Sequence, residues 1–228
     1  MTDLNELVSA IQDAAPAPLL RRRMGAVAAI NSNKTINVTV AGSTTTITGV
    51  HYFGHYAPKV GAQVWLDTDG RDWVATGAIA GSGGANPSCK VYRTSDQSIA
   101  TGSTFVNVSW NAAQFDPWGM WTSGTNVTVP ITGRYLVNAT VHFNAASPYT
   151  VSYRSGRLYQ NGGPLNIVQT DSPVGNVIWA QSMSVIVNAT AGDYFQLAAR
   201  QNSGITIPIA SSAASETQLT VTYLGPDT

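Results

Sequence analysis

The sequence has little charge and almost no cysteine. Only 11% of its 228 residues are charged, and twelve basic residues balance twelve acidic ones, whereas about 25% of residues are charged in an ordinary soluble domain. This balance provides no basic surface for a phosphate backbone, so we expect no nucleic-acid partner. Because Cys89 is the single cysteine, the chain can form neither an intrachain disulfide nor a zinc cluster of cysteines. We expect its thiol to be buried and inert.

Long apolar runs are also missing. None approaches the ~18 residues of a membrane-spanning helix, so we expect no membrane insertion. The first fifteen residues are acidic and amphipathic, unlike the basic and apolar start of a secretory signal. The expectation is therefore synthesis in a cytoplasm without export by the usual route. Hydrophobic residues still make up 43% of the chain, which is enough for a core and argues against a disordered tail.

Helical periodicity is confined to residues 3–14. Its apolar stripe recurs at the spacing i, i+3, i+4, i+7 and consists of Leu4, Leu7, Val8 and Ile11. A helix this short is marginal alone in water, so the stripe must dock on the rest of the chain, on copies of itself or on another protein. We favour copies or a partner, and assign residues 1–22 to an assembly helix and arm. Arginines 21–23 are either solvated charges or a contact to an acidic neighbour.

From residue 24 the pattern changes to short alternating strands. Five are expected, at 26–30, 35–40, 44–50, 63–67 and 73–79, with turn residues between them. Five short strands suit a small closed barrel, because closure leaves no exposed edges. We assign residues 23–80 to this barrel and the Gly-rich residues 81–87 to a linker.

Residues 88–228 again consist of strands separated by turns. Eight strands are expected, at 89–93, 104–110, 126–130, 133–144, 156–160, 177–187, 194–199 and 217–224. Residues 135–143 alternate apolar with Thr, Asn and His, so one face is apolar and the other polar. Such spacing favours a two-sheet sandwich or jelly roll. The predicted fold is therefore mainly β: a short helix, a small barrel and a sandwich.

An ordered series of motifs in this second part resembles the C1q-like domains of the TNF superfold. The series is Q-F-D-P-W-G-M-W with Phe115, Asp116 and Trp121, then V-P-I-T-G-R-Y with Pro130, Gly133 and Tyr135, L-Y-Q-N-G at 158–162, A-G-D-Y-F-Q-L at 191–197, and a closing strand at 217–225. The resemblance implies a jelly roll with Tyr135 in its core. It also implies a homotrimer packed through apolar and aromatic faces. Asn161-Gly162 suits a type I′ turn, which needs positive φ at both residues.

The barrel segment resembles the OB-fold domains of bacteriophage tail and baseplate proteins. The resembling residues are V-G-A-Q-V-W-L at 60–66 and W-V-A-T-G-A-I at 73–79. An OB-like domain followed by a C1q-like domain is similar to a minor tail protein at the phage tail tip. The resemblance implies a virion protein whose first part attaches to other tail proteins and whose head faces the host surface. Two rivals are a cellular C1q-like lectin or adhesin and a purely structural tail subunit.

No motif for catalysis or metal binding stands out, so the sequence predicts no enzyme, no catalytic residues, no metal and no cofactor. His51 and His55 have the spacing of a helical metal pair but lie in a Gly-containing strand-to-loop region. Residues 67–72, D-T-D-G-R-D, lack the ligand spacing of an EF-hand and are better interpreted as a hairpin turn. His142 has no nucleophile-elbow serine to work with.

Four aromatic residues in loop-like segments are candidates for stacking on a cell-wall carbohydrate of the host. They are Trp118, Trp121, Tyr149 and Tyr153. Binding residues favour loops on rigid scaffolds. The alternative is that these rings pack in the core or at the trimer interface.

Overall fold

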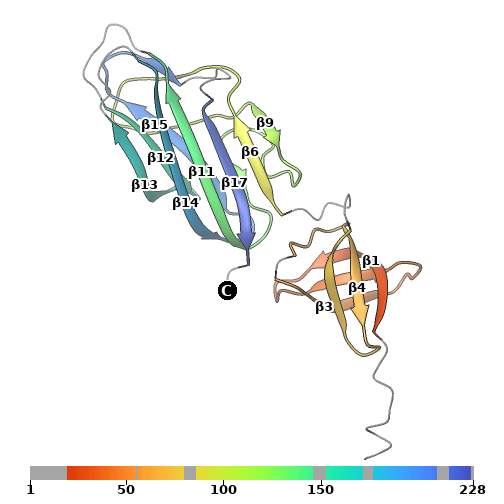
Figure 1. Ribbon diagram of the computed structural model, residues 1–228. Coiled ribbons are helices and arrows are strands. Elements are labelled where there is room, and N and C mark those ends of the chain that lie inside the picture. The colour runs from red at the N-terminus through yellow and green to blue at the C-terminus, as the bar shows by residue number, and fades with distance from the viewer. Residues whose placement is uncertain are drawn as a thin grey trace, which may run out of the picture. The chain divides into compact units, whose positions relative to one another are not determined.

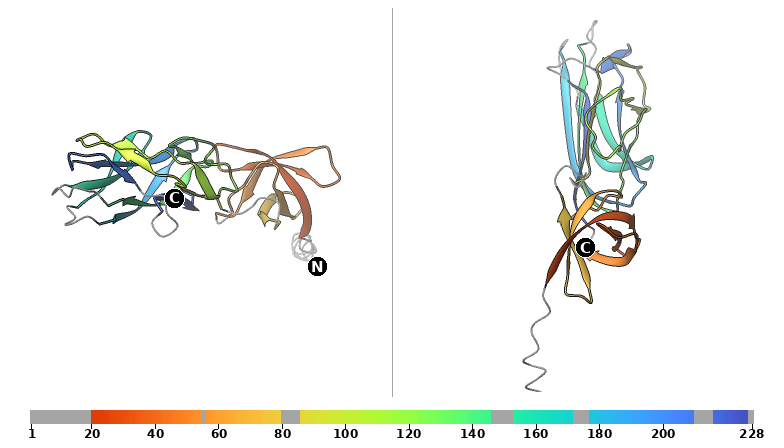
Figure 2. Two further views of the ribbon diagram at one scale, coloured as in Figure 1. Left: turned by 90° about the horizontal axis from the view of Figure 1, so that it is seen from above. Right: turned by 90° about the vertical axis from the view of Figure 1, so that its right-hand side faces the viewer.

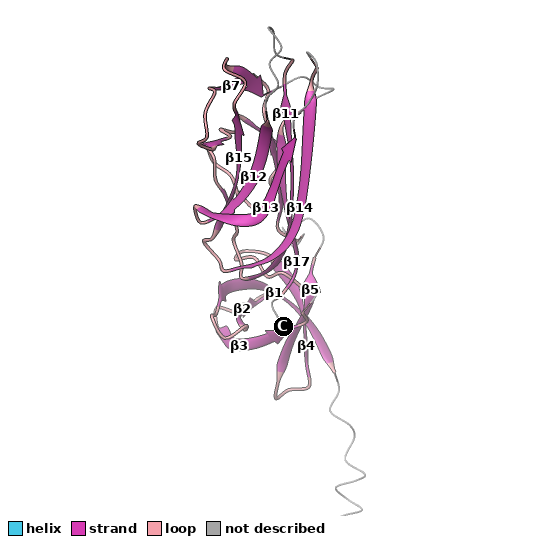
Figure 3. Ribbon diagram, turned by 90° about the vertical axis from the view of Figure 1, so that its left-hand side faces the viewer, coloured by secondary structure: helices cyan, strands magenta, loops and turns pink. Residues whose placement is uncertain are grey.

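The computed structural model describes residues 20–54, 56–79, 86–145, 153–171, 177–209 and 216–226 (Figure 1). The chain divides into two compact units, residues 1–84 and 85–228, and the division lies within the stretch expected as a linker. Figure 3 shows only strands, turns and loops among the described residues. The prediction of a mainly β fold is therefore confirmed. The assembly helix with Leu4, Leu7, Val8 and Ile11 lies outside the described residues.

The first unit is a closed five-stranded barrel with the strand order β1-β2-β3-β5-β4. Its strands are β1 (Arg21–Ile30), β2 (Ile36–Val40), β3 (Thr46–Tyr52), β4 (Gln63–Thr68) and β5 (Trp73–Ala78). All neighbours pair antiparallel except β3 and β5, which run parallel. Alternation fills the interior with fully buried side chains such as Ile36, Val38 and Leu66. Gly25 is needed there, because a Cβ would lie 2.5 Å from Val38 Cγ1 and 2.8 Å from Leu66 Cδ1.

The barrel begins earlier than the sequence pattern suggested. Residues 21 and 22 were assigned to the arm, but β1 starts at Arg21 and Arg22 pairs with Asp67 of β4. The Arg22 guanidinium donates two hydrogen bonds to the Asp67 carboxylate, at 2.8 and 2.9 Å. This bidentate contact holds the pKa of Asp67 below its usual range. Of the two interpretations of the arginine run, contact with an acidic neighbour is therefore correct for Arg22.

Residues 68–72 form a turn held by side-chain acceptors. Asp69 Oδ1 accepts from the backbone N–H groups of Arg71 and Asp72, at 2.8 and 2.9 Å. Thr68 Oγ1 accepts from the N–H of Gly70, whose φ is 94°. These contacts identify D-T-D-G-R-D as a hairpin turn.

The second unit is a two-sheet sandwich, and its two layers are visible in Figure 2. One sheet, called here the outer sheet, has the order β10-β15-β12-β13, with β8 also paired to β15; the other, the inner sheet, has the order β7-β16-β11-β17-β6-β9, with β14 paired to β11. The strands are β6 (Ser88–Tyr92), β7 (Gln97–Ile99), β8 (Val106–Asn107), β9 (Ala112–Phe115), β10 (Val127–Thr128), β11 (Gly133–Phe143), β12 (Arg154–Gln160), β13 (Gly163–Asp171), β14 (Trp179–Ala189), β15 (Tyr194–Gln201), β16 (Ile207–Ile209) and β17 (Gln218–Gly225).

Strict alternation along β11 builds the centre of this sandwich. Every second side chain from Tyr135 to Phe143 is buried, and those between are not. Tyr135 is fully buried, as predicted. Its hydroxyl donates a 2.7 Å hydrogen bond to the carbonyl of Ile131, and its ring meets those of Phe195 and Tyr223. Burial raises the pKa of this phenol.

The turn between β12 and β13 has the conformation that the sequence predicted. Asn161 and Gly162 have φ values of 52° and 75°, as a type I′ turn requires.

Among the described residues, no helix is long and apolar enough to span a membrane.

Candidate functional site

Trp118 and Trp121 lie in the loop after β9, and both are half-buried. The carboxylate of Asp116 shapes this loop, because its two oxygens accept from the N–H groups of Met120 and Trp121 at 2.8 and 2.9 Å. The Trp121 indole N–H donates to the carbonyl of Gly124 at 3.3 Å. The Trp121 ring is therefore held at the loop surface with part of its area in solvent.

An open depression of about 470 Å³ borders this loop. Its lining is polar and without charge, and consists of Gly119, Met120, Thr122, Ser123, Gly124, Thr125, Asn126 and Thr128. Gln196 of β15 fixes one wall by donating to Thr125 Oγ1 and Asn126 Oδ1, at 2.9 and 2.8 Å. Hydroxyl and amide groups such as these form hydrogen bonds with sugars, but neither Trp118 nor Trp121 is among the residues that line the depression.

Tyr153 lies in a different neighbourhood. Its ring centre is 5.0 Å from the guanidinium carbon of Arg200, and its N–H donates to Asn202 Oδ1. Tyr149 lies outside the described residues. Tyr153 thus belongs to a group of residues that the sequence pattern did not predict as a site.

We call this group the arginine cluster: Phe105, Tyr153, Arg157, Tyr159 and Arg200. The guanidinium carbons of Arg157 and Arg200 lie 4.7 and 4.5 Å from the centre of the Phe105 ring. Tyr159 meets the same ring edge-on, with centres 6.3 Å apart. Arg157 of β12 faces Ala198, and Arg200 of β15 faces Ser155; alternation directs both side chains to the face of the outer sheet opposite to that of Leu158 and Leu197. Ala198 and Ser155 on this face are fully buried, and the two arginines are half-buried.

A second exposed surface, called here the neutral face, covers the side of the inner sheet that points away from the core. It runs across β14, β11, β17 and β6, which lie side by side in Figure 1. Its central residues carry hydroxyl, amide and aliphatic groups: Leu136, Asn138, Thr140, Ser182, Ser184, Ile186, Thr220 and Thr222. The hydroxyls of Thr140 and Ser182 are 3.1 Å apart.

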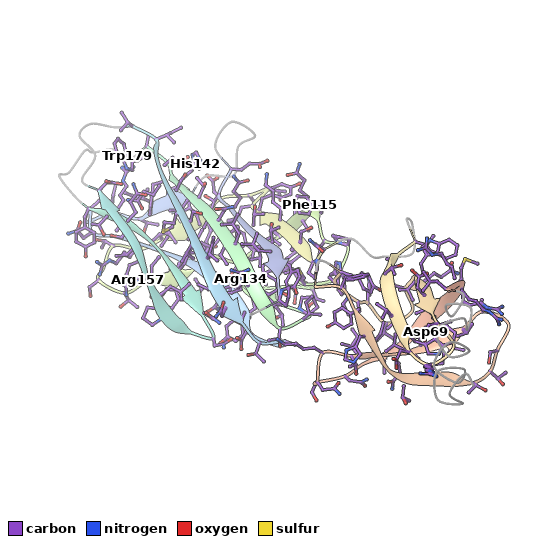
Figure 4. All side chains as sticks on the ribbon, turned by 60° about the horizontal axis from the view of Figure 1, so that its bottom comes forward. Asp69, Phe115, Arg134, His142, Arg157 and Trp179 are labelled. Carbon is purple, nitrogen blue, oxygen red and sulfur yellow. The ribbon has the colours of Figure 1, made fainter. Side chains whose placement is uncertain are left out.

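Charged or titratable side chains on this face are few. Arg134 and His142 lie toward the two ends of β11, as Figure 4 shows, whereas Lys90 lies in the middle of β6, opposite Thr220. Burial lowers the pKa of His142, which favours its neutral form. Lys90 of β6 pairs with Glu216 at 4.0 Å. Ile186 of β14, the strand at the edge of this face, is 60% exposed, a large apolar side chain that a monomer would leave in water.

Neither the lone thiol nor His51 forms part of a catalytic or metal-binding cluster among the described residues. Cys89 is fully buried, as expected, and burial raises its pKa to about 12, with Asp116 adding to the shift. His51 is exposed, and His55 lies outside the described residues. The described part of the chain holds no group of three or more His, Cys, Asp or Glu side chains placed to bind a metal ion.

Comparison with known proteins yields likeness at the level of fold only. No family model and no curated protein sequence matches the chain. Among solved structures, it is similar to the globular domain of zebrafish complement 1qA protein, with 12% identity, a TM-score of 0.45, and coverage of 62% of this chain and 99% of that one. It is also similar to murine APRIL, with 16% identity, a TM-score of 0.46, and coverage of 61% and 100%. Because these scores are low, the description of the second unit as a two-sheet sandwich rests on its own strand pairing.

Proposed function

We propose that this chain is a trimeric, non-enzymatic protein of a bacteriophage tail tip, with an OB-like barrel that contacts other tail proteins and a C1q-like head that binds the host surface. The observation that carries the proposal is the neutral face. A surface strand ordinarily presents charged residues to water, whereas this sheet presents Thr, Ser, Asn, Leu and Ile. Depletion of charge over most of a surface is the composition of an interface core.

The exposed apolar residues also suggest how three copies would meet. Besides Ile186 on the neutral face, Val168 of β13 and Val177 and Ile178 before β14 are 40–52% exposed. They lie toward the β13–β14 side of the sandwich, at a different place from β17 and β6. Two different surfaces that fit each other give a heterologous contact, which closes into a ring when the rotation is right. We therefore propose that the β13–β14 side of one copy, which includes Ile186 of β14, packs on the β17–β6 part of the neutral face of the next.

The barrel and its position before the sandwich in the chain support the proposal of a phage tail protein. A five-stranded closed barrel precedes the sandwich in the chain, the order on which the resemblance to phage minor tail proteins depends. Attachment through the N-terminal part and recognition through the head remain proposals that follow from this resemblance. The protein would then be synthesised in the host cytoplasm and incorporated into the virion.

An interface substitution tests the assembly. Ile186→Arg places a charge on β14, within the β13–β14 side that is proposed to pack on the next copy, and we expect it to convert trimers into monomers while the sandwich stays folded by circular dichroism. Val60→Arg is the matched control, because Val60 is 58% exposed on the barrel and should leave the trimer intact. A trimer that survives Ile186→Arg would contradict the proposed interface.

Localisation and recognition need separate measurements. Gold-labelled antibody against the chain should mark tail tips of the phage that encodes it, and purified trimer should sediment with host cell walls. Tail labelling without wall binding would favour a purely structural subunit. Glycan binding by a protein that is absent from virions would favour a cellular lectin.

A further inference from the structure

We propose that the arginine cluster is a binding site for an oxyanion, a carboxylate or phosphate group carried by a surface polysaccharide. The proposal deepens the proposed host-binding role of the head and does not depend on the trimer. Its starting point is that two guanidinium groups from neighbouring strands share the single ring of Phe105, at 4.7 and 4.5 Å. Two positive charges on one ring repel each other, and the ring quadrupole offsets only part of this cost.

No acidic side chain within the described residues pairs with either arginine. The five described carboxylates of the second unit all have other partners. Asp96 accepts from Asn144, Asp116 from the loop backbone, Asp171 from Gln181, Asp193 from Asn161, and Glu216 pairs with Lys90. The cluster therefore keeps its positive charge uncompensated in a unit that has few charges.

The guanidinium donors are also largely unused. Arg200 Nη1 donates to the carbonyl of Ser103 at 3.2 Å. The Nε atoms of both Arg157 and Arg200 are buried and have no hydrogen-bond partner in the described part of the chain. A buried donor without a partner costs about 1–3 kcal/mol, so two of them on adjacent cations are expensive for a purely structural contact. An oxyanion that accepts from the Nη groups of the two arginines would neutralise their charge, although the buried Nε atoms are out of its reach.

The chemistry of the cluster narrows the ligand. A guanidinium presents a planar fork that fits the two oxygens of a carboxylate or phosphate. The Tyr153 ring lies 5.0 Å from the Arg200 guanidinium and the Tyr159 ring 6.3 Å from the Phe105 ring, and both tyrosines are half-buried. Aromatic rims with hydroxyls suit a sugar or polyol that carries the anionic group. The site therefore fits an acidic saccharide unit or a polyol phosphate better than a free inorganic ion.

The test uses the full chain and three polymers. Polygalacturonate supplies carboxylates, poly(glycerol phosphate) supplies phosphates, and dextran is the uncharged control; binding is measured by calorimetry at low and high salt. We expect binding to at least one polyanion, weakening with salt, and none to dextran. Binding to polygalacturonate alone identifies the carboxylate source, binding to poly(glycerol phosphate) alone the phosphate source, and binding to both a general oxyanion site. Failure of both polyanions to bind would overturn the proposal.

Charge-matched variants separate a built site from general electrostatic attraction. The double variant Arg157→Gln/Arg200→Gln should weaken binding at least tenfold, and Arg157→Lys/Arg200→Lys, which keeps the charge but loses the planar fork, should weaken it to an intermediate degree. Arg71→Gln removes a charge from an exposed turn of the barrel and should have no effect. Arg157→Gln and Arg200→Gln each remove one charge, as Arg71→Gln does, and each should weaken binding; an equal loss in Arg71→Gln would contradict the proposal. Thermal unfolding of each variant shows that Phe105 and its loop remain folded.

The arginine-cluster proposal and the proposed host-binding function can fail separately. If wild-type chain and the double Gln variant sediment equally with host walls, the cluster proposal fails and the host-binding proposal stands. If the chain binds a polyanion through the arginines but is found neither on virions nor on host walls, the cluster proposal stands and the host-binding proposal fails.

Discussion

Asn161 and Asp193 are 32 residues apart in the sequence and are joined by a 2.7 Å hydrogen bond from Asn161 Nδ2 to Asp193 Oδ1. Asn161 returns the contact by accepting from the N–H of Tyr194 at 2.9 Å. The other carboxylate oxygen of Asp193 accepts from Gln160 Nε2 and from the N–H of Thr190. The β12–β13 turn is thereby locked to the entry of β15, and two of the motifs that carried the family resemblance form one structural unit.

Replacing Asp193 should therefore weaken the sandwich and change its response to acid. The hydrogen bonds from Thr190 and Asn161 hold the pKa of Asp193 below its usual range. The ionised carboxylate contributes stability above the unfolded-state pKa of about 3.9, and this contribution is lost as pH falls through the lower folded pKa. We expect Asp193→Asn to lower the unfolding midpoint at pH 7 and to flatten the loss of stability below about pH 4.

Chemical unfolding across pH 2–7 measures both effects. Asp72→Asn makes the same chemical change at an exposed position of a barrel turn and serves as the control. An acid limb of the same steepness in Asp193→Asn and in wild type would show that Asp193 does not contribute in this way.

Loss of the Tyr135 hydroxyl should cost about 1–2 kcal/mol of the free energy of unfolding, because the buried carbonyl of Ile131 loses its donor. Tyr135→Phe keeps the ring and its packing, so urea denaturation isolates the hydrogen bond. Tyr194→Phe is the control, because the Tyr194 hydroxyl makes no hydrogen bond within the described residues. Equal stability of Tyr135→Phe and wild type would rule out a stabilising role for this bond.

A methyl group at Gly133 should destabilise the sandwich by about 1–3 kcal/mol through overpacking. A Cβ there would collide with the carbonyl oxygen of Gly225, and would lie 2.5 Å from the ring of Tyr223. Gly204→Ala is a useful comparison, because a Cβ at Gly204 meets nothing within 4 Å and φ is 83°, so that variant reports the backbone cost alone. The expected order of midpoints in thermal unfolding is wild type, Gly204→Ala, Gly133→Ala.

The thiol of Cys89 should resist labelling in the native protein. It is fully buried, and its pKa of about 12 leaves almost no thiolate at pH 8. A disulfide reagent should therefore react with less than one tenth of the chains before denaturant is added, and with all of them afterwards. Rapid labelling of the native chain would mean that β6 opens readily.

The elements that the sequence predicted well are those whose pattern is long and local. Alternation from Tyr135 to Phe143 identified β11, and Asn161-Gly162 identified the turn after β12 together with its positive φ values. The three-residue strands β7 and β16 were missed because so short a segment carries too little periodicity. The nine-residue β13 was also missed, because Pro164 and the polar residues of the strand interrupt the apolar alternation. The barrel start was placed late, since Arg21–Arg23 look like a charge run until β4 supplies Asp67 as a partner.

The arginine cluster could not be found by reading along the chain. Phe105, Arg157 and Arg200 are far apart in sequence, and only the pairing of β12 with β15 and the position of the β8 segment bring them together. The outward direction of Arg157 was predictable from alternation with Leu158, but its sharing of one ring with Arg200 was not. Tyr153 was selected for its loop-like surroundings, and the structure assigns it to a charged site rather than to the tryptophan loop.

The central claim is that the neutral face is covered by a neighbouring copy, and the solution mass tests it most directly. Light scattering on the purified full chain, repeated over a hundredfold dilution, should give three times the chain mass of 24.0 kDa. A constant mass of one chain over that range, from a protein that stays folded and soluble, would contradict the account.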